Sequence, residues 1–507
     1  MSLSHFLRTS VAAAVILGAA SAADAVQTLT INGTGATIII TTRADPVSHL
    51  DGFEDTTPVA PVGGNPGTTL GQQRLNVYAY VAGIWANNVA SSVPITVNAG
   101  WESLTCDATS AVLGSAGAWN IWRDFANGVP GTWYPAALAN KLSGMNLTDG
   151  TPDDGSGFGN VDIKTQFNIN LGNPGCLTGT PFYLGLDGNA GSKVNFVETL
   201  LHELGHGLGF SVLTVQTSTG RRLAADGSAF VATGGLPSIW EGFMFDNTAG
   251  KTWLTMTNAE RAASAINPLK LAWIGPQTVA GAAVTLSATP SLRVETPVPG
   301  IPGFYDYNTA SFGPPPTNPG AFGTLAVVPA DPVNGAGCLP FSPAVTAAVM
   351  GKIAMIDRGV CGFAVKAKNA QNAGAFGVII VNNAAGGPPG LGGSDPTITI
   401  PTVSVSQAQG AVLKQAVADA VKYGTRSRPG SVVANFAFDT SRKAGADALG
   451  RPLLYTPNPL IGGSSVSHWD VSAFPNLLME PNINADLTTS LVPPLDLTLP
   501  LLKDIGW

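Results

Sequence analysis

The sequence predicts an α+β protein in which a small α/β domain interrupts a larger one. Residues 193–210 place apolar side chains at helical spacing, and residues 162–170 alternate apolar and polar side chains like a half-buried strand. Residues 352–381 have the pattern of a strand, a helix and a second strand. A chain of 507 residues is also too long for one compact core, so several domains are expected.

The helix expected at 193–210 contains the motif His202-Glu203-Leu204-Gly205-His206. Residues four apart lie on one face of a helix, so His202 and His206 can ligate a single metal ion. Glu203 lies beside them, where a carboxylate can act as a general base. With only five histidines in the chain, a chance occurrence of this spacing is a poor alternative. The motif therefore predicts one catalytic Zn²⁺.

The other side of this helix is apolar and should anchor it in a core. Its apolar residues are Val197, Leu200, Leu201, Leu204 and Leu208. Three glycines, Gly205, Gly207 and Gly209, each disfavour a helix by about 1 kcal/mol relative to Ala. We therefore expect another segment to approach the helix closely, or the chain to turn sharply at Gly209.

The net charge and the lengths of the apolar segments argue against two kinds of partner, nucleic acid and a membrane. A net charge of −7 leaves no basic surface for nucleic acid. Residues 1–23 resemble a signal peptide, and no later apolar run is long enough to span a membrane. The mature chain is therefore expected to be secreted, either extracellular or periplasmic.

Four cysteines fit two disulfides in an oxidising compartment. Three pairings are possible. Proximity in the chain favours Cys106 with Cys176 and Cys338 with Cys361, and free buried thiols are the alternative.

The chain is expected to have five segments. These are the signal peptide at 1–23, an N-terminal extension or pro-segment at 24–60, the first part of a catalytic domain at 61–276, an inserted domain at 277–440, and the C-terminal part of the catalytic domain at 441–507. Within the first part, residues 75–89 predict a buried helix capped by Thr68 or Thr69, and residues 95–97 predict a short strand. Residues 101–133 have no clear period.

Two further segments bear on ligands. Residues 149–160 hold Asp149, Asp153 and Asp154 among glycines, which could bind calcium, although a solvated turn is favoured because the spacing matches no known calcium loop. The strand at 162–170 precedes the metal helix closely. It is expected to border the cleft and pair with an extended substrate backbone.

Three stretches give the chain a resemblance to a known family. Residues 202–210, His468 in Ser-His-Trp-Asp, and Met479 resemble the zinc helix, displaced third ligand and Met-turn of metzincin metalloproteases, in particular the leishmanolysin-like branch. Residues 351–361 and 366–382 are similar to the core of a protease-associated (PA) domain. The resemblance implies a twisted sheet plus an active-site helix, interrupted by a PA domain at 277–440, with Met479 supporting the metal site.

One position departs from the usual metzincin pattern. The third histidine normally follows the second by six residues, and Val212 stands there. The remaining candidates are His49, His468, Asp226 and Glu241. His49 lies in a Pro- and Gly-rich stretch and Asp226 in a turn sequence, whereas His468 comes close once the inserted domain is set aside. We therefore expect His468 to be the third ligand. No Tyr follows Met479 closely, so the sequence names no side chain for an oxyanion.

The predicted function is a secreted zinc endopeptidase that hydrolyses proteins or peptides, with Glu203 as general base. The alternative is a catalytically silent secreted binding protein in which zinc is structural and the PA domain recruits partners. A structural zinc site would be closed by a fourth protein ligand and would not need Glu203. The presence of Glu203 favours the enzyme.

Overall fold

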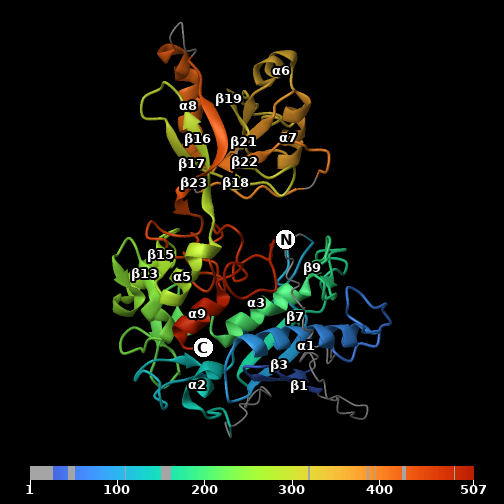
Figure 1. Ribbon diagram of the computed structural model, residues 1–507, viewed down its shortest axis with the longest axis vertical. Helices are drawn as coiled ribbons and strands as arrows, with labels where there is room; N and C mark the ends of the chain where they lie inside the picture. The colour runs from blue at the N-terminus through green and yellow to red at the C-terminus, as the bar shows by residue number, and fades with distance from the viewer. Residues whose placement is uncertain are drawn as a thin grey trace, which may run out of the picture. The chain divides into compact units, whose positions relative to one another are not determined.

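The computed structural model divides the chain into two compact units. The first unit contains residues 1–286 and 445–507, and the second contains residues 287–444 (Figure 1). The structure describes residues 27–43, 52–108, 110–149, 161–317, 320–384, 387–393, 395–424, 430–484 and 486–507. The predicted signal peptide, His49 and residues 150–160 of the acidic loop lie outside these ranges.

A five-stranded sheet forms the centre of the first unit, in the order β1-β2-β3-β7-β4. Strands β2, β3 and β7 are parallel to one another, while β1 and β4 pair antiparallel at the two edges. The strands are β1 (Thr28–Asn32), β2 (Thr37–Arg43), β3 (Ile95–Glu102), β7 (Ile163–Asn168) and β4 (Gly114–Ala118).

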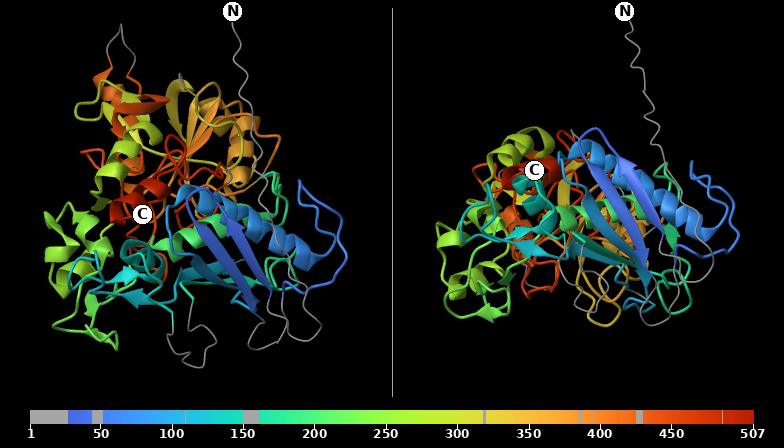
Figure 2. Two further views of the ribbon diagram at one scale, coloured as in Figure 1. Left: turned by 60° about the horizontal axis from the view of Figure 1, so that its bottom comes forward. Right: turned by 90° about the horizontal axis from the view of Figure 1, so that it is seen from below.

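Two helices pack together on this sheet (Figure 2). Helix α1 (Leu70–Asn88) packs on β1 and β2, and helix α3 (Phe196–Leu208) packs on β7 and β4. Thr69 caps α1, as its sequence predicts, by accepting a hydrogen bond from the backbone N–H of Gln72. The indole N–H of buried Trp85 on α1 donates to the carbonyl of Leu201 on α3 at 3.2 Å. Helix α1 therefore supports the back of the metal-motif helix.

The N-terminal segment, expected as an extension or pro-segment at 24–60, contributes two strands to the sheet of the first unit. Its described part, residues 27–43, supplies β1 and β2, and β2 pairs with β3 along six residues, from Ile38 to Arg43. Leu29, Ile31, Ile38 and Ile40 are buried in the core of the first unit. Within each pair these residues are two positions apart, which is the spacing typical of a strand. Removing these strands would expose the edge of β3.

The strand predicted at 162–170 is present as β7, but its predicted role is wrong. Hydrogen bonds to β3 on one side and β4 on the other occupy both edges of β7. No edge is left on it for a substrate backbone. The edge of the sheet next to β7 belongs to β4, whose sequence Gly-Ser-Ala-Gly-Ala has little intrinsic preference for a strand.

The rest of the first unit consists of short elements around this core. They are β5 (Ile121–Trp122), β6 (Tyr134–Pro135), α2 (Ala136–Ser143), β8 (Phe182–Tyr183), β9 (Val194–Asn195), β10 (Val215–Gln216), β11 (Arg221–Leu223), β12 (Phe230–Val231), β13 (Met244–Asp246), β14 (Lys251–Thr252), α4 (Asn258–Ser264), β15 (Leu271–Trp273), α5 (Pro276–Thr285), α9 (Thr498–Ile505) and the 3-10 turns η1 (Ile239–Phe243) and η2 (Trp253–Thr255).

The C-terminal segment returns to the first unit through α9. Helix α9 packs against α5, and Asp504 accepts hydrogen bonds from the indole N–H of Trp273 at 3.0 Å and from the backbone N–H of Gln277 at 2.8 Å. This contact explains why α5 belongs to the first unit. The sequence-based boundary at residue 277 was wrong, because it assigned α5 to the inserted domain. Among the described helices, none is long and apolar enough to cross a membrane.

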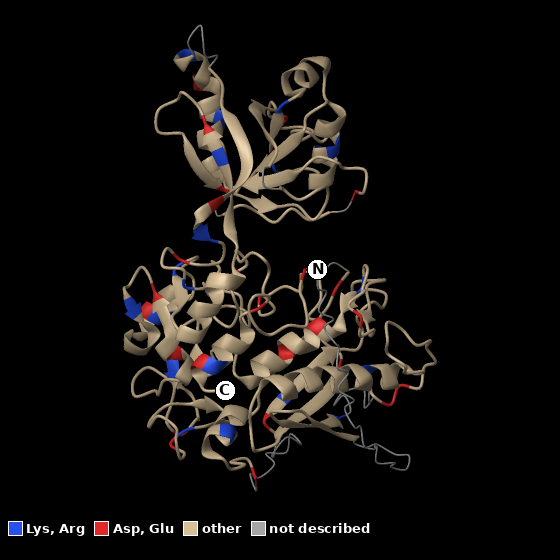
Figure 3. Ribbon diagram, viewed as in Figure 1, with Lys and Arg blue, Asp and Glu red and all other residues tan. Residues whose placement is uncertain are grey.

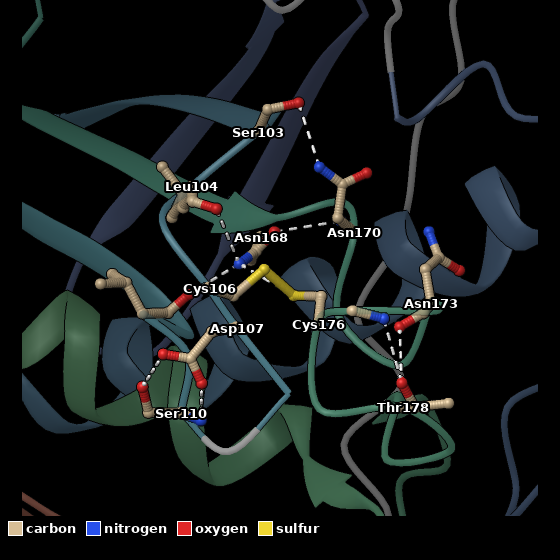
Figure 4. The surroundings of a disulfide bond; sticks show 12 residues. Ser103, Leu104, Cys106, Asp107, Ser110, Asn168, Asn170, Asn173, Cys176 and Thr178 are labelled. Carbon is tan, nitrogen blue, oxygen red and sulfur yellow. Dashed lines mark hydrogen bonds between the residues drawn. A yellow bond between two sulfur atoms is a disulfide. The ribbon is translucent and has the colours of Figure 1, made fainter.

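Both disulfides favoured by proximity in the chain are present. Cys106–Cys176 joins the loop after β3 to the loop after β7, across 70 residues (Figure 4). Beside it, the Asn168 side chain donates to the carbonyls of Leu104 at 3.3 Å and Val112 at 3.0 Å. The disulfide and the amide together fix the segment that leads into β4.

The second unit contains an eight-stranded sheet in the order β17-β16-β23-β19-β20-β21-β22-β18. Strands β19 to β22 are parallel, and the predicted strand–helix–strand is β20-α7-β21. The elements are β16 (Ala288–Glu295), β17 (Gly303–Asp306), β18 (Asn308–Thr309), β19 (Phe322–Val327), α6 (Pro343–Val349), β20 (Ile353–Asp357), α7 (Phe363–Asn372), β21 (Gly377–Val381), β22 (Thr402–Val405), α8 (Gln407–Tyr423) and β23 (Val433–Lys443).

We expect a fragment of residues 287–444 to fold alone and to bind no zinc. Its first and last strands, β16 and β23, pair with each other from Ala288↔Lys443 onward, so the cut ends lie side by side. It has its own buried core and the Cys338–Cys361 disulfide. A cooperative thermal transition and a dispersed amide spectrum would agree with this expectation; a molten, rapidly proteolysed fragment would contradict it.

Candidate metal centre and cleft

Helix α3 is shorter than the predicted 193–210 because specific caps define its ends. The Asn195 side chain accepts a hydrogen bond from the Val197 N–H at 3.1 Å and begins the helix. Gly209 ends it with a φ of 119°, in the left-handed region that favours glycine. Between the caps every residue except Glu198 is buried. The apolar side holds the helix in the core, as its spacing predicts.

Two of the three glycines allow other segments to approach the helix. A Cβ atom on Gly205 would lie 2.8 Å from the sulfur of Met479, and one on Gly207 would lie 2.3 Å from the Cγ2 of Ile163 in β7. Met479 is fully buried. Its side chain therefore packs against the helix at Gly205, and the absence of a side chain at 205 leaves room for it.

Three histidines converge at this point of the first unit. The Nε2 atom of His206 lies 3.0 Å from that of His202 and 3.1 Å from that of His468, although His468 is 262 residues away in the chain. All three side chains are buried. Among the described residues, His202, His206 and His468 are the one group of three or more potential ligands placed close enough to hold a metal ion.

The second nitrogen of each ring is held by a backbone carbonyl. The Nδ1 atoms of His202, His206 and His468 lie 2.7, 2.7 and 2.8 Å from the carbonyl oxygens of Leu478, Phe210 and Ser464. A carbonyl oxygen can only accept, so each Nδ1 carries the proton. The three Nε2 atoms are then unprotonated, and each turns a lone pair toward the others.

This arrangement fits a bound cation. The lone pair of His206 lies about 3 Å from those of His202 and His468, and these three lone pairs repel one another and have no donor to satisfy them among the three rings. Zinc binds imidazole nitrogen at about 2.0–2.1 Å in tetrahedral geometry, which separates two ligand nitrogens by about 3.3 Å. The spacing of the Nε2 atoms is close to that value. The donor set of neutral imidazoles is also one that zinc prefers.

Burial keeps the histidines unprotonated. It lowers the pKa of His202 to about 4, and burial together with the repulsion that a second protonated ring would meet from His202 lowers the pKa of His468 to about 3. Burial and the other two rings hold the pKa of His206 well below its usual range. The ligands are therefore ready for a metal at neutral pH.

Glu203 lies in the same cleft and has the opposite shift. Burial raises the pKa of Glu203 to about 8, and a hydrogen bond from the backbone N–H of Ala116 in β4 opposes that rise. Helix α3 bears acidic residues but no Lys or Arg (Figure 3), so no basic side chain on the helix offsets the effect of burial. A cation held by the histidines would favour the ionised carboxylate.

These shifts predict that zinc binding at pH 6 releases no more than about one proton. Histidines with the ordinary pKa of about 6.5 would be mostly protonated at that pH, and three of them would release about two protons on binding. Here the lowered pKa values of the three histidines leave Glu203 as the main source of released protons. Calorimetry in buffers of different ionisation enthalpy measures the number, and release of two or more protons would contradict the histidine shifts. Glu203→Gln should release almost none.

The cleft in front of the histidines has a volume of about 1120 Å³. Residues 111–116 of β4 and its preceding segment form one wall, and residues 188–191 and 193–195 with α3 continue it. Residues 462–464 and 481–484 also line the cleft. The cleft lies entirely within the first unit.

The other candidate ligands lie elsewhere. The Asp226 side chain is exposed and accepts hydrogen bonds from the N–H and hydroxyl of Ser228, closing the turn that its sequence predicts. Glu241 is buried, but it pairs with Arg222 at 2.7 Å and accepts from the Ser238 N–H at 3.0 Å. Both carboxylates therefore have structural partners outside the cleft.

Sequence reasoning missed two parts of this site. Strand β4 contributes the edge along the cleft, and its Gly- and Ala-rich sequence gave no strand signal. The carbonyls that orient the histidines are backbone groups, which no motif can reveal. The only available hint for one of them was the position of Leu478 immediately before Met479.

Comparison with known protein families identifies one part of the chain. Residues 321–413 match the PA domain family, so the predicted PA domain is present within the second unit. The match does not extend to the histidine cluster.

Two curated proteins are similar over short stretches. Human ER degradation-enhancing alpha-mannosidase-like protein 3 is 39% identical over 79 residues, which is 14% of this chain and 8% of that protein. Leucine aminopeptidase 2 of Arthroderma otae is 46% identical over 69 residues, which is 13% of this chain and 14% of that protein. The chain thus spans only a small part of these relatives, one of which is named for a mannosidase and the other for an aminopeptidase.

Two solved aminopeptidases are also similar in part. The zinc aminopeptidase BSAP from Bacillus subtilis has 24% identity and a TM-score of 0.21, with 32% of this chain and 36% of that chain covered. The aminopeptidase from Aneurinibacillus sp. strain AM-1 has 19% identity and a TM-score of 0.20, with 40% and 42% covered. Scores this low do not establish a common fold.

Proposed function

We propose that this chain is a secreted zinc endopeptidase whose catalytic unit has a metzincin-like arrangement. The proposal rests on the convergence of three unprotonated Nε2 atoms beside buried Glu203. These groups lie in a cleft bordered by a free strand edge. The two disulfides support export, because disulfides persist in oxidising compartments.

In this proposal His202, His206 and His468 hold the ion and Glu203 moves the proton. Zinc, when bound, would supply Lewis acidity and lower the pKa of a water molecule. The Glu203 carboxylate takes a proton from the attacking water and returns it to the amine that leaves. The Ala116 N–H holds that carboxylate in place against the strand. Met479 packs beneath Gly205 and keeps the floor of the site dry.

Strand β4 is suited to bind an extended peptide backbone. Leu113 accepts from the Asn168 N–H, and Trp119 donates to the Asp162 carbonyl, so odd-numbered residues of this segment face β7. Backbone groups alternate along a strand, so Gly114 and Ala116 face the opposite way. Glu203 takes the Ala116 N–H. The N–H and carbonyl of Gly114 and the carbonyl of Ala116 then remain to pair with a substrate added to the edge.

An aminopeptidase is the second candidate, because one relative that is similar over 69 residues carries that name. An enzyme of this type acts only at a free amino terminus, whereas a cleft with an open strand edge accepts a chain that continues past the site in both directions. The edge of β4 therefore favours cleavage within a chain. The silent binding protein remains the alternative without catalysis.

Peptides blocked at both ends separate these three possibilities. The purified chain should cleave N-acetylated, C-amidated peptides internally, lose the activity with a zinc chelator, and regain it when zinc is restored. Products identified by mass spectrometry give the cleavage site. Stepwise release of single residues from unblocked peptides alone would support the aminopeptidase, and no hydrolysis of either set would support the binding protein.

A further inference from the structure

We propose that Asp496 is a positioning residue for the metal site, which it serves by fixing Leu478, the residue whose carbonyl orients His202. The inference rests on the proposed zinc site. It concerns a carboxylate that touches neither the histidines nor the cleft, and that no sequence motif marks.

Asp496 is buried and satisfied by backbone groups. One carboxylate oxygen accepts from the Leu478 N–H at 2.8 Å, and the other accepts from the Thr498 N–H at 2.6 Å. Only 2% of the residue is exposed. Among the described residues no Lys or Arg forms an ion pair with it. A buried carboxylate without a cation is costly, so its place at this turn calls for a specific role.

One residue, Leu478, connects Asp496 to the metal site. Asp496 holds the N–H of Leu478, and the carbonyl of the same residue accepts the Nδ1–H of His202 at 2.7 Å. Outer partners of this kind set the tautomer and orientation of a ligating histidine. The acceptor here is backbone, so no side-chain substitution can delete it. Asp496 is the side chain through which its position can be tested.

The same turn is tied to the third histidine. The Met479 carbonyl accepts from the Trp469 N–H at 2.8 Å, and Trp469 follows His468 directly. Glu480 accepts from the Leu477 N–H at 2.9 Å. Thr498 is the first residue of α9, so Asp496 connects the start of that helix to a turn that contacts both ligand-bearing segments. Loss of Asp496 should loosen Leu478 without removing any ligand.

Asp496→Ala should therefore weaken zinc binding about 10-fold, at the lower end of the 10- to 100-fold typical of outer-shell partners. The matched control is Asp162→Ala. Asp162 is also buried, at 1% exposure, and accepts from the Thr96 N–H at 2.9 Å and the Asn140 amide at 2.8 Å. Burial raises the pKa of both Asp162 and Asp496 to about 6. Both variants should lose stability, but Asp162→Ala should change zinc affinity less than about twofold.

The experiment uses the full chain and two readouts. Competition with a chelating dye gives the zinc affinity, and NMR of the metal-free protein follows the ring Nδ1–H of His202, assigned from a His202→Gln variant. In Asp496→Ala that signal should broaden or shift while the signals of His206 persist. Asp162→Ala should leave it unchanged.

Two results would overturn the inference. One is an unchanged His202 signal in Asp496→Ala, and the other is an equal loss of zinc affinity in both variants, which would mean a general effect of stability. Failure of the proposed function looks different, because the wild-type protein would then either bind no zinc or bind it without cleaving blocked peptides. The NMR comparison still tests the positioning role in that case.

Discussion

Glu203→Gln is expected to lower turnover of a blocked peptide by at least about 100-fold while zinc stays bound. Removal of a general base costs about 10²–10⁴ in rate. Glutamine has nearly the same shape and can still accept the hydrogen bond from the Ala116 N–H, so the strand and helix should keep their contact. The three histidines are untouched. The loss should therefore fall on kcat, with KM little changed.

The control for this variant is a second buried glutamate outside the cleft. Glu241→Gln removes a charge that pairs with Arg222, yet its side chain can still accept from the Ser238 N–H. That variant should lose stability and keep its activity per folded molecule. Activity of Glu203→Gln close to that of Glu241→Gln would refute the role of Glu203 as the base.

His468→Ala is expected to weaken zinc binding by more than the 10- to 100-fold that loss of an outer partner costs, and to abolish hydrolysis. The variant leaves two ligands, His202 and His206, where a catalytic zinc site uses three. It also removes the contact with the Ser464 carbonyl, which belongs to a turn lining the cleft. The effect should appear as loss of metal after dialysis against a weak chelator.

Asp226→Ala provides the comparison for His468→Ala. Asp226 is exposed and accepts hydrogen bonds from Ser228 within its own turn. Its removal should change neither zinc content nor activity. Full zinc occupancy in purified His468→Ala, or loss of zinc in Asp226→Ala, would show that the third ligand had been assigned to the wrong residue.

Local patterns predicted the parts of the fold that are encoded locally. The amphipathic helix at α3 and the βαβ unit at β20-α7-β21 follow from side-chain spacing, and the cap at Thr69 follows from residue type. The sequence also suggested His468, but only after residues 277–440 were set aside as an insert. The contact between His206 and His468 spans 262 residues and leaves no local pattern in the sequence. His468 could be predicted because the chain has few histidines.

The parts that sequence did not predict depend on tertiary contacts. Strand β4 has a Gly- and Ala-rich sequence and forms because β7 pairs with it and Glu203 holds its outer edge. Helix α5 looked like the start of the inserted domain, yet Asp504 of α9 fixes it to the first unit. Asp496 acts through the backbone of Leu478, and backbone partners leave no trace in residue identity.

X-ray absorption at the zinc edge, combined with metal analysis of the purified chain, tests the central claim most directly. We predict one zinc per chain with three imidazole nitrogens at about 2.0–2.1 Å and one oxygen ligand from solvent. A closed site with four protein ligands would indicate structural zinc. Two ions per chain, or none, would contradict a single catalytic ion held by His202, His206 and His468.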